Sequence, residues 1–175
     1  DEQWDEIPKT DIGAMLLKIS MLVSKHVGGS SGPIWGTGFM KGAMLTRGKT
    51  SITLQDLADM LGSAIEGIQA RGGAKLGDKT LLDALIPVHE TLKEHAASGG
   101  ELGTALCDAA DAAEKAIDDT RNLVAHRGRA SQVGERSANT PDPGIVAIAT
   151  ILHDWCKDSG IARTASVSEV AKATA

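Results

Sequence analysis

Three stretches of the sequence combine glycine with residues that bind anions, and each lies where a predicted helix begins or ends. They read "GGSSGP" at 28–33, "RGGAKLGDKT" at 71–80 and "HRGRASQVGERSANTPDPG" at 126–144. The N–H groups at a helix N-terminus attract phosphate, glycines let its oxygens approach, and serine hydroxyls add donors. Arg127 and Arg129 add fork-shaped N–H donors. These residue types therefore predict that the chain binds a phosphate group.

Other groups of residues give weaker evidence for a nucleotide or metal site. The stretch "GGSSGP" lacks the final Lys and Ser or Thr of a P-loop, so a Walker-type site is not expected. The pairs Asp108 with Asp111 and Asp118 with Asp119 fit the solvated face of an Ala-rich helix better than a metal site, and the five histidines have no ligand spacing. For the glycine-rich stretches, a second interpretation stays open, in which they are only turns between helices.

The elements that must position these stretches are helices. The chain has one Phe and no Tyr, and Ala, Gly and Leu are its commonest residues, which predicts an all-α protein. Thr53 with Asp56 forms a capping-box-like start, and Asp142 with Pro143 makes an N-cap and first turn. Apolar residues at helical spacing predict six helices: from residue 10 or 11 to 26, from about 33, from 53 to about 72, from 78 or 80 to about 97 with a bend at Pro87, from 102 to 124, and from 142 to 158.

Glycine-rich connections between successive helices predict an antiparallel up-and-down bundle. In such a bundle the second, fourth and sixth helices start at the same end, so the three stretches would meet there and form a pocket. A length of 175 residues predicts a single domain over 1–175, with a weakly helical or flexible tail at 159–175.

Bulk composition narrows the partners and the compartment. The net charge is −5 and no basic run stands out, so a nucleic-acid-binding surface is not expected. Cys107 and Cys156 lack CxxC spacing, which predicts two buried free thiols in a reducing compartment. No apolar run approaches the roughly 20 residues of a membrane span, and no signal peptide is seen, so a cytoplasmic protein without membrane contact is predicted.

Beyond these physical inferences, the order and spacing of three motifs carry a resemblance to a family. The motifs "VGGSSGPIWGTGF", "RGGAKLGDKTLLDAL" and "HRGRASQVGERSANTPDPG" resemble the nucleotide-binding L subunit, or C-terminal L domain, of dihydroxyacetone kinases, over about 11–158. The resemblance implies a barrel-like antiparallel helical fold that holds ADP or ATP at one end.

The same resemblance implies a set of nucleotide contacts, transferred by matched position. Ser30 and Ser31 would contact the phosphates, Gly72 would lie beside the adenine, and Leu81 would pack on the base. The remaining implied contacts are Arg129 and the "DPG" loop of Asp142, Pro143 and Gly144.

One family motif is missing from the chain. Family members carry an upstream helix and a "GDxDHG" loop whose aspartates bind two Mg²⁺ ions, and this sequence contains no such motif. Because the first residue is Asp1 rather than Met, we expect an upstream segment that was cleaved or not observed, with a degenerate binder as the alternative. The resemblance thus implies no catalytic or metal-binding residue in these 175 residues, which alone are expected to be inactive.

The resemblance also implies a function and partners. It predicts a subunit that transfers a phosphoryl group to dihydroxyacetone held on a K subunit, with a phosphotransferase-system protein as the donor and a transcription regulator as a further partner. ADP retained as a cofactor and ATP exchanged freely both stay open. The alternatives are a non-catalytic nucleotide-binding module and an L subunit for another small ketose.

Overall fold

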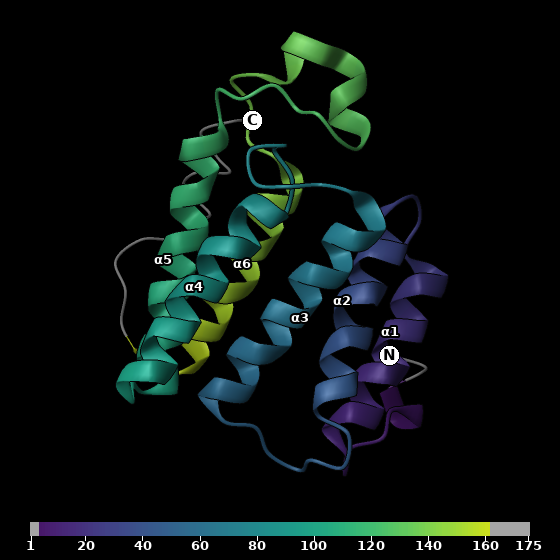
Figure 1. Ribbon diagram of the computed structural model, residues 1–175, viewed down its shortest axis with the longest axis vertical. Helices are drawn as coiled ribbons and strands as arrows, with labels where there is room; N and C mark the ends of the chain where they lie inside the picture. The colour runs from purple at the N-terminus through teal and green to yellow at the C-terminus, as the bar shows by residue number, and fades with distance from the viewer. Residues whose placement is uncertain (1–3, 162–175) are drawn as a thin grey trace. The chain divides into compact units, whose positions relative to one another are not determined.

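The computed structural model describes residues 4–161, in which packing separates two compact units, Asp1–Gly73 and Ala74–Ala175. Within each unit, successive helices run in alternating directions (Figure 1). The described residues contain no strand, so the predicted all-α class is confirmed. The prediction of one domain stays a prediction, and most of the predicted tail at 159–175 lies outside the described residues. The helices are α1 (Ile12–His26), α2 (Ser31–Leu45) and α3 (Leu54–Gly72) in the first unit, and α4 (Leu82–Ser98), α5 (Leu102–Thr120) and α6 (Pro143–Asp158) in the second, with short 3₁₀ segments η1 (Trp4–Glu6) and η2 (Arg129–Ser137).

Glycines bring α1 and α2 into close contact in the first unit. A Cβ on Gly32 would stand 2.1 Å from the carbonyl oxygen of Val27, and one on Gly36 would stand 2.0 Å from Ser24 Oγ. Ser20 Oγ donates a 2.6 Å hydrogen bond to the Gly36 carbonyl across the same contact. At both positions a Cβ would clash with α1 or its C-cap residue, so the close approach of the two helices requires glycine.

In the second unit, α5 packs against both α4 and α6, around a core that includes the fully buried Leu82, Ile117 and Ile145. Cys107 of α5 and Cys156 of α6 are buried, as predicted, but they form a disulfide. The prediction of free thiols was wrong, because helix packing brings together two cysteines that are 49 residues apart and carry no spacing motif.

The start of α4 and the end of α5 differ from the predictions. α4 begins at Leu82 rather than 78 or 80, because residues before it enter a turn in which Gly77 and Lys79 have positive φ. α5 ends at Thr120 rather than 124. Between these two helices, η2 occupies the middle of the stretch 126–144 and is broken at Gly134.

Three other helix starts agree with the predictions. Asp11 caps α1, Thr53 and Asp56 form a capping box on α3, and Asp142 caps α6 with Pro143 in the first turn. No helix in the described part of the chain has the length and apolar character that a membrane crossing requires.

Candidate functional site

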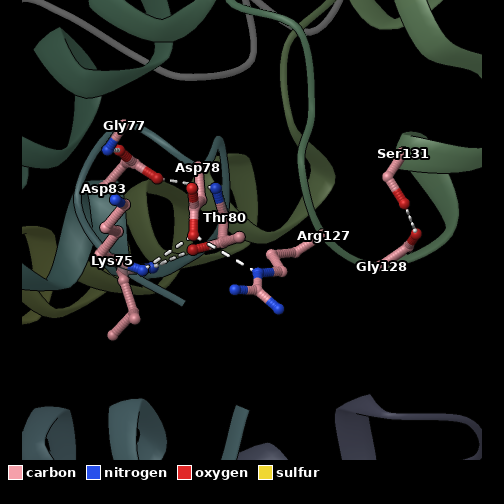
Figure 2. Close-up of polar contacts among 9 residues, drawn as sticks. Lys75, Gly77, Asp78, Thr80, Asp83, Arg127, Gly128 and Ser131 are labelled. Atoms are coloured by element: carbon pink, nitrogen blue, oxygen red, sulfur yellow. Dashed lines mark hydrogen bonds and ion pairs between the residues drawn. The ribbon is translucent and has the colours of Figure 1, made fainter. Parts of the chain in front are cut away.

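The loop at 74–81, which leads into α4, is shaped by a carboxylate from the helix it precedes. Asp83 is buried in the first turn of α4, and its two oxygens accept hydrogen bonds from the N–H groups of Gly77 at 2.6 Å and Thr80 at 2.7 Å (Figure 2). The φ of Gly77 is +91°, a region that favours glycine. Asp83 thereby fixes the turn that carries Asp78 and Lys79.

Asp78 connects this loop to the segment after α5. Its carboxylate accepts the N–H of Lys75 at 3.0 Å and approaches Arg127 Nε at 3.5 Å (Figure 2). Its carbonyl oxygen accepts the N–H of His126 at 3.1 Å. The Lys75 N–H, and then the Arg127 guanidinium, lower the pKa of Asp78, because they stabilise its charged form against the opposing effect of burial.

Lys79 is a buried lysine, with only 2% of its surface exposed. Its ammonium donates to three carbonyl oxygens, those of Arg121 at 2.8 Å, Leu123 at 2.9 Å and Ser137 at 2.7 Å. Burial lowers the pKa of Lys79, while the charge of Asp142 acts in the opposite direction. All three N–H donors of the ammonium are thus used inside the protein.

The segment that Lys79 contacts, 121–140, is folded back on itself by further hydrogen bonds. Ser137 Oγ donates to the Gly134 carbonyl at 2.6 Å and accepts the N–H of Ala125 at 2.9 Å. Ser131 Oγ donates to the Gly128 carbonyl at 2.7 Å, one turn into η2 (Figure 2). Arg129 is exposed at the start of η2.

The start of α6 brings several sequence-predicted residues together. Asp142 Oδ1 accepts the N–H groups of Gly144 at 2.9 Å and Ile145 at 3.0 Å, and Pro143 occupies the first turn. A Cβ on Gly144 would stand 3.2 Å from Leu81 Cβ, so Leu81 lies directly against this helix start. Burial raises the pKa of Asp142, and the two N–H bonds oppose that rise.

The start of α2 in the first unit has a different character. Ser30 and Ser31 are exposed, Ser30 makes no side-chain capping bond, and the first turn of α2 carries no acidic residue. Gly72, at the end of α3, lies next to this turn, since a Cβ there would stand 3.3 Å from Ile34 Cδ1. This helix start therefore keeps the polarity that attracts an anion, whereas the start of α6 is already neutralised by Asp142.

The predicted site residues fall into two groups. Leu81, Pro143 and Gly144 meet Asp142 at the start of α6, and Arg129 lies in the segment that Lys79 holds. Ser30, Ser31 and Gly72 belong to the first unit. The meeting of all three glycine-rich stretches in one pocket stays a prediction.

Sequence reasoning missed Asp78, Lys79 and Asp83, which organise the loop. Their only signal was their place in "GDKTLLD", where no amphipathic pattern needs a lysine between two acids. Lys79 bonds to three residues that lie 42, 44 and 58 positions later in the chain. Contacts over such distances cannot be recognised from the spacing of residues in the sequence.

The described side chains also decide whether this part of the chain could itself hold a metal ion. Within 4–161, no group of three or more His, Cys, Asp or Glu side chains is placed to hold a metal ion. Asp118 pairs with Arg121 at 3.2 Å and Asp119 pairs with Lys115, as expected of a solvated helix face. The side chains described here do not fit a magnesium site.

Comparison with known proteins identifies the family. The chain is 37% identical over 152 residues to the "PEP-dependent dihydroxyacetone kinase, ADP-binding subunit DhaL" of Escherichia coli (strain K12), covering 87% of this chain and 72% of that one. It is 36% identical over 146 residues to the "PEP-dependent dihydroxyacetone kinase 2, ADP-binding subunit DhaL" of Listeria innocua, covering 82% and 67%. It is also 36% identical over 140 residues to the "L-erythrulose kinase" of Pectobacterium atrosepticum, covering 80% and 24%. Residues 1–157 match the family model described as "DAK2 domain", so the chain belongs to the DAK2 domain family.

Proposed function

We propose that this chain is the nucleotide-binding subunit of a dihydroxyacetone kinase. In this function it holds ADP or ATP and serves phosphoryl transfer to dihydroxyacetone on a partner K subunit. The observation that carries the proposal is its similarity to two ADP-binding subunits over more than four fifths of its length. The positions matched to the family lie at the starts of α2, α4, η2 and α6, except for Gly72, which ends α3.

The geometry of the α2 start supports the phosphate-binding part of the proposal. Ser30 and Ser31 expose their hydroxyls at an N-terminus that has no carboxylate of its own. A helix start of this kind favours a negative ligand, and glycines before it let the ligand approach the backbone. We assign the nucleotide phosphates to Ser30 and Ser31.

The remaining matched positions receive the rest of the nucleotide. We assign Gly72 and Leu81 to the adenine, and Arg129 to the phosphates because an exposed guanidinium suits them. Asp142 is assigned with Pro143 and Gly144 as a backbone contact, since its carboxylate is already bound to the first N–H groups of α6. Mg²⁺ is proposed only as a companion of the nucleotide, and no step is assigned to it.

The partners follow from the names of the relatives. Two of them are PEP-dependent, which supports a phosphotransferase-system protein as the phosphoryl donor. A K subunit would hold the acceptor, a transcription regulator would be a further partner, and the cytoplasm would be the compartment.

A second candidate rests on one relative. The similarity to an L-erythrulose kinase supports a subunit that serves another small ketose. Because the partner would read the acceptor sugar, the two candidates make the same demands on this chain. A non-catalytic nucleotide-binding module is the third alternative, and an assay for transfer separates it from both kinases.

Calorimetric titration of ADP tests the nucleotide site. Ser30→Ala and Ser31→Ala are each expected to weaken ADP binding about tenfold, because each removes a hydrogen bond to a charged phosphate oxygen. Ser51→Ala, an exposed serine in the loop between α2 and α3, is the matched control and should bind like the wild type. Wild-type protein that binds neither ADP nor ATP, with or without Mg²⁺, would refute the proposal.

A reconstituted assay tests the reaction. The chain is combined with a K subunit, dihydroxyacetone and either a PEP-driven phosphotransferase donor or ATP, and dihydroxyacetone phosphate is measured. Turnover with the PEP-driven donor supports the main proposal, and turnover only with L-erythrulose supports the second candidate. ADP binding without any turnover contradicts the main proposal and supports the non-catalytic module.

A further inference from the structure

The proposal concerns Lys79, whose backbone and side chain are both unusual. Its φ is +59°, a conformation that only a few per cent of non-glycine residues adopt. Its side chain is buried, although lysine is almost never fully buried unless it is paired. Residues held in such conformations cluster where the surrounding structure imposes them for a function.

The bonds of Lys79 all end on one segment. The three carbonyl oxygens that accept from its ammonium belong to Arg121, Leu123 and Ser137, on both sides of the arginines of "HRGRAS". Arg121 is the C-cap of α5, where the negative end of the helix dipole favours a cation. The ammonium therefore joins the end of α5 to the end of η2 and closes the segment between them.

Asp78, the residue before Lys79, contacts the same segment. The Asp78 carbonyl accepts from the His126 N–H, and the Asp78 carboxylate approaches Arg127. Two successive residues of the 74–81 loop thus bind the segment at five places, four of them on backbone groups. Nothing else in the side-chain chemistry of the loop requires a lysine here.

We infer that Lys79 is a positioning residue, whose ammonium fixes the backbone of 121–137 so that Arg127 and Arg129 are held for the nucleotide phosphates. This role rests on the proposed function, although the structural part of it does not. Lys79 itself touches no nucleotide in this assignment. Its loss would leave three inward-facing carbonyls without their donor and would free the segment to move.

The test compares Lys79→Met with the wild-type full chain by two measurements. Titration with ADP and with adenosine separates the phosphate contribution from that of the base. Lys79→Met is expected to weaken ADP binding at least tenfold and adenosine binding less than twofold, because only the arginines lose their position. Amide hydrogen exchange within 121–137 should be faster in Lys79→Met than in the wild type, and this increase should exceed any increase in α4 and α6.

Leu92→Ala is the matched control for a merely structural effect. Leu92 is buried in α4 and has no bond to the 121–137 segment, so this change lowers stability without altering the ratio of ADP to adenosine affinity. Where Lys79→Met does not fold, Lys79→Gln takes its place, since its amide supplies two of the three N–H donors.

An unchanged affinity ratio, or unchanged exchange within 121–137, would overturn the inference. Wild-type protein that binds no ADP would refute the proposed function instead, and the exchange measurement would still decide whether Lys79 fixes the segment.

Discussion

At the scale of single residues, Asp78 and Lys79 show that a lowered pKa has two different meanings. The pKa of Asp78 falls because the Lys75 N–H and Arg127 favour its charge, so its charged form stabilises the fold. The pKa of Lys79 falls because burial disfavours its charge, and three carbonyl oxygens offset part of that cost. Ionisation of Asp78 therefore stabilises the fold, whereas the charge of Lys79 is kept inside the fold at a cost that its three hydrogen bonds reduce.

Asp142 gives a prediction on pH. Burial raises its pKa above the ordinary 3.8, so the folded protein binds this proton more tightly than the unfolded chain. Its contribution to stability is present at low pH and is lost as pH rises through the raised pKa. Asp142→Asn keeps the N-cap and removes this loss, so its free energy of unfolding should gain on that of the wild type as pH rises above 3.8.

Urea unfolding at a series of pH values measures the difference. Asp142→Ala is the comparison variant, since it removes the cap as well and should cost about 1 kcal/mol. A difference between Asp142→Asn and the wild type that does not vary with pH would contradict the burial of this carboxylate.

At the scale of elements, the contact of α1 with α2 depends on positions that exclude a side chain. Gly32→Ala would push a Cβ to within 2.1 Å of the Val27 carbonyl oxygen, so the chain must shift. We expect a loss of roughly 1–3 kcal/mol in the free energy of unfolding, the usual cost of overpacking.

Gly28→Ala is the control for this prediction, because a Cβ there would meet nothing within 4 Å. Both variants are measured by thermal and urea unfolding with the wild type. Equal stabilities of the two variants would show that α1 and α2 do not approach as closely as described.

The elements also show what the sequence can predict and why it stops. Caps act within a few residues, so Thr53 and Asp142 located two helix starts correctly, and residue 10 or 11 placed the start of α1 to within one position. The end of α5 was missed because the ammonium of Lys79, 42 residues earlier in the chain, binds the carbonyl of the C-cap residue Arg121, just after the last helical residue. A periodic apolar pattern continues to Val124 regardless of that contact, and so it predicted a helix that is too long.

The candidate site shows the same limit. Motif order singled out the loops, and the structure places Leu81 against Gly144 beside Asp142. The carboxylate of Asp83 and the ammonium of Lys79 were not predicted, since burial of a charge depends on partners that are distant in sequence.

At the scale of the whole molecule, the family model spans residues 1–157 and therefore both compact units. The disulfide lies entirely within the second unit and joins α5 to α6. It closes a loop whose two cysteines are 49 residues apart, so it restricts the unfolded chain as well as the folded one.

Reduction with dithiothreitol tests this link. We expect the free energy of unfolding to fall by about 2–4 kcal/mol, with faster amide exchange in α5 and α6. The double variant Cys107→Ala, Cys156→Ala should be insensitive to the reductant, which controls for its other effects. Equal stability of the wild type with and without reductant would contradict the disulfide.

The bonds from Lys79 to the 121–137 segment have a consequence for exchanging parts between relatives. Lys79 in the 74–81 loop completes the hydrogen bonding of a segment that begins more than 40 residues later. The loop and the segment therefore depend on each other. In a DAK2 domain without a lysine at this position, the transplanted arginine segment would bring three carbonyls without their donor. Such a domain would have to receive the turn that carries Lys79 as well.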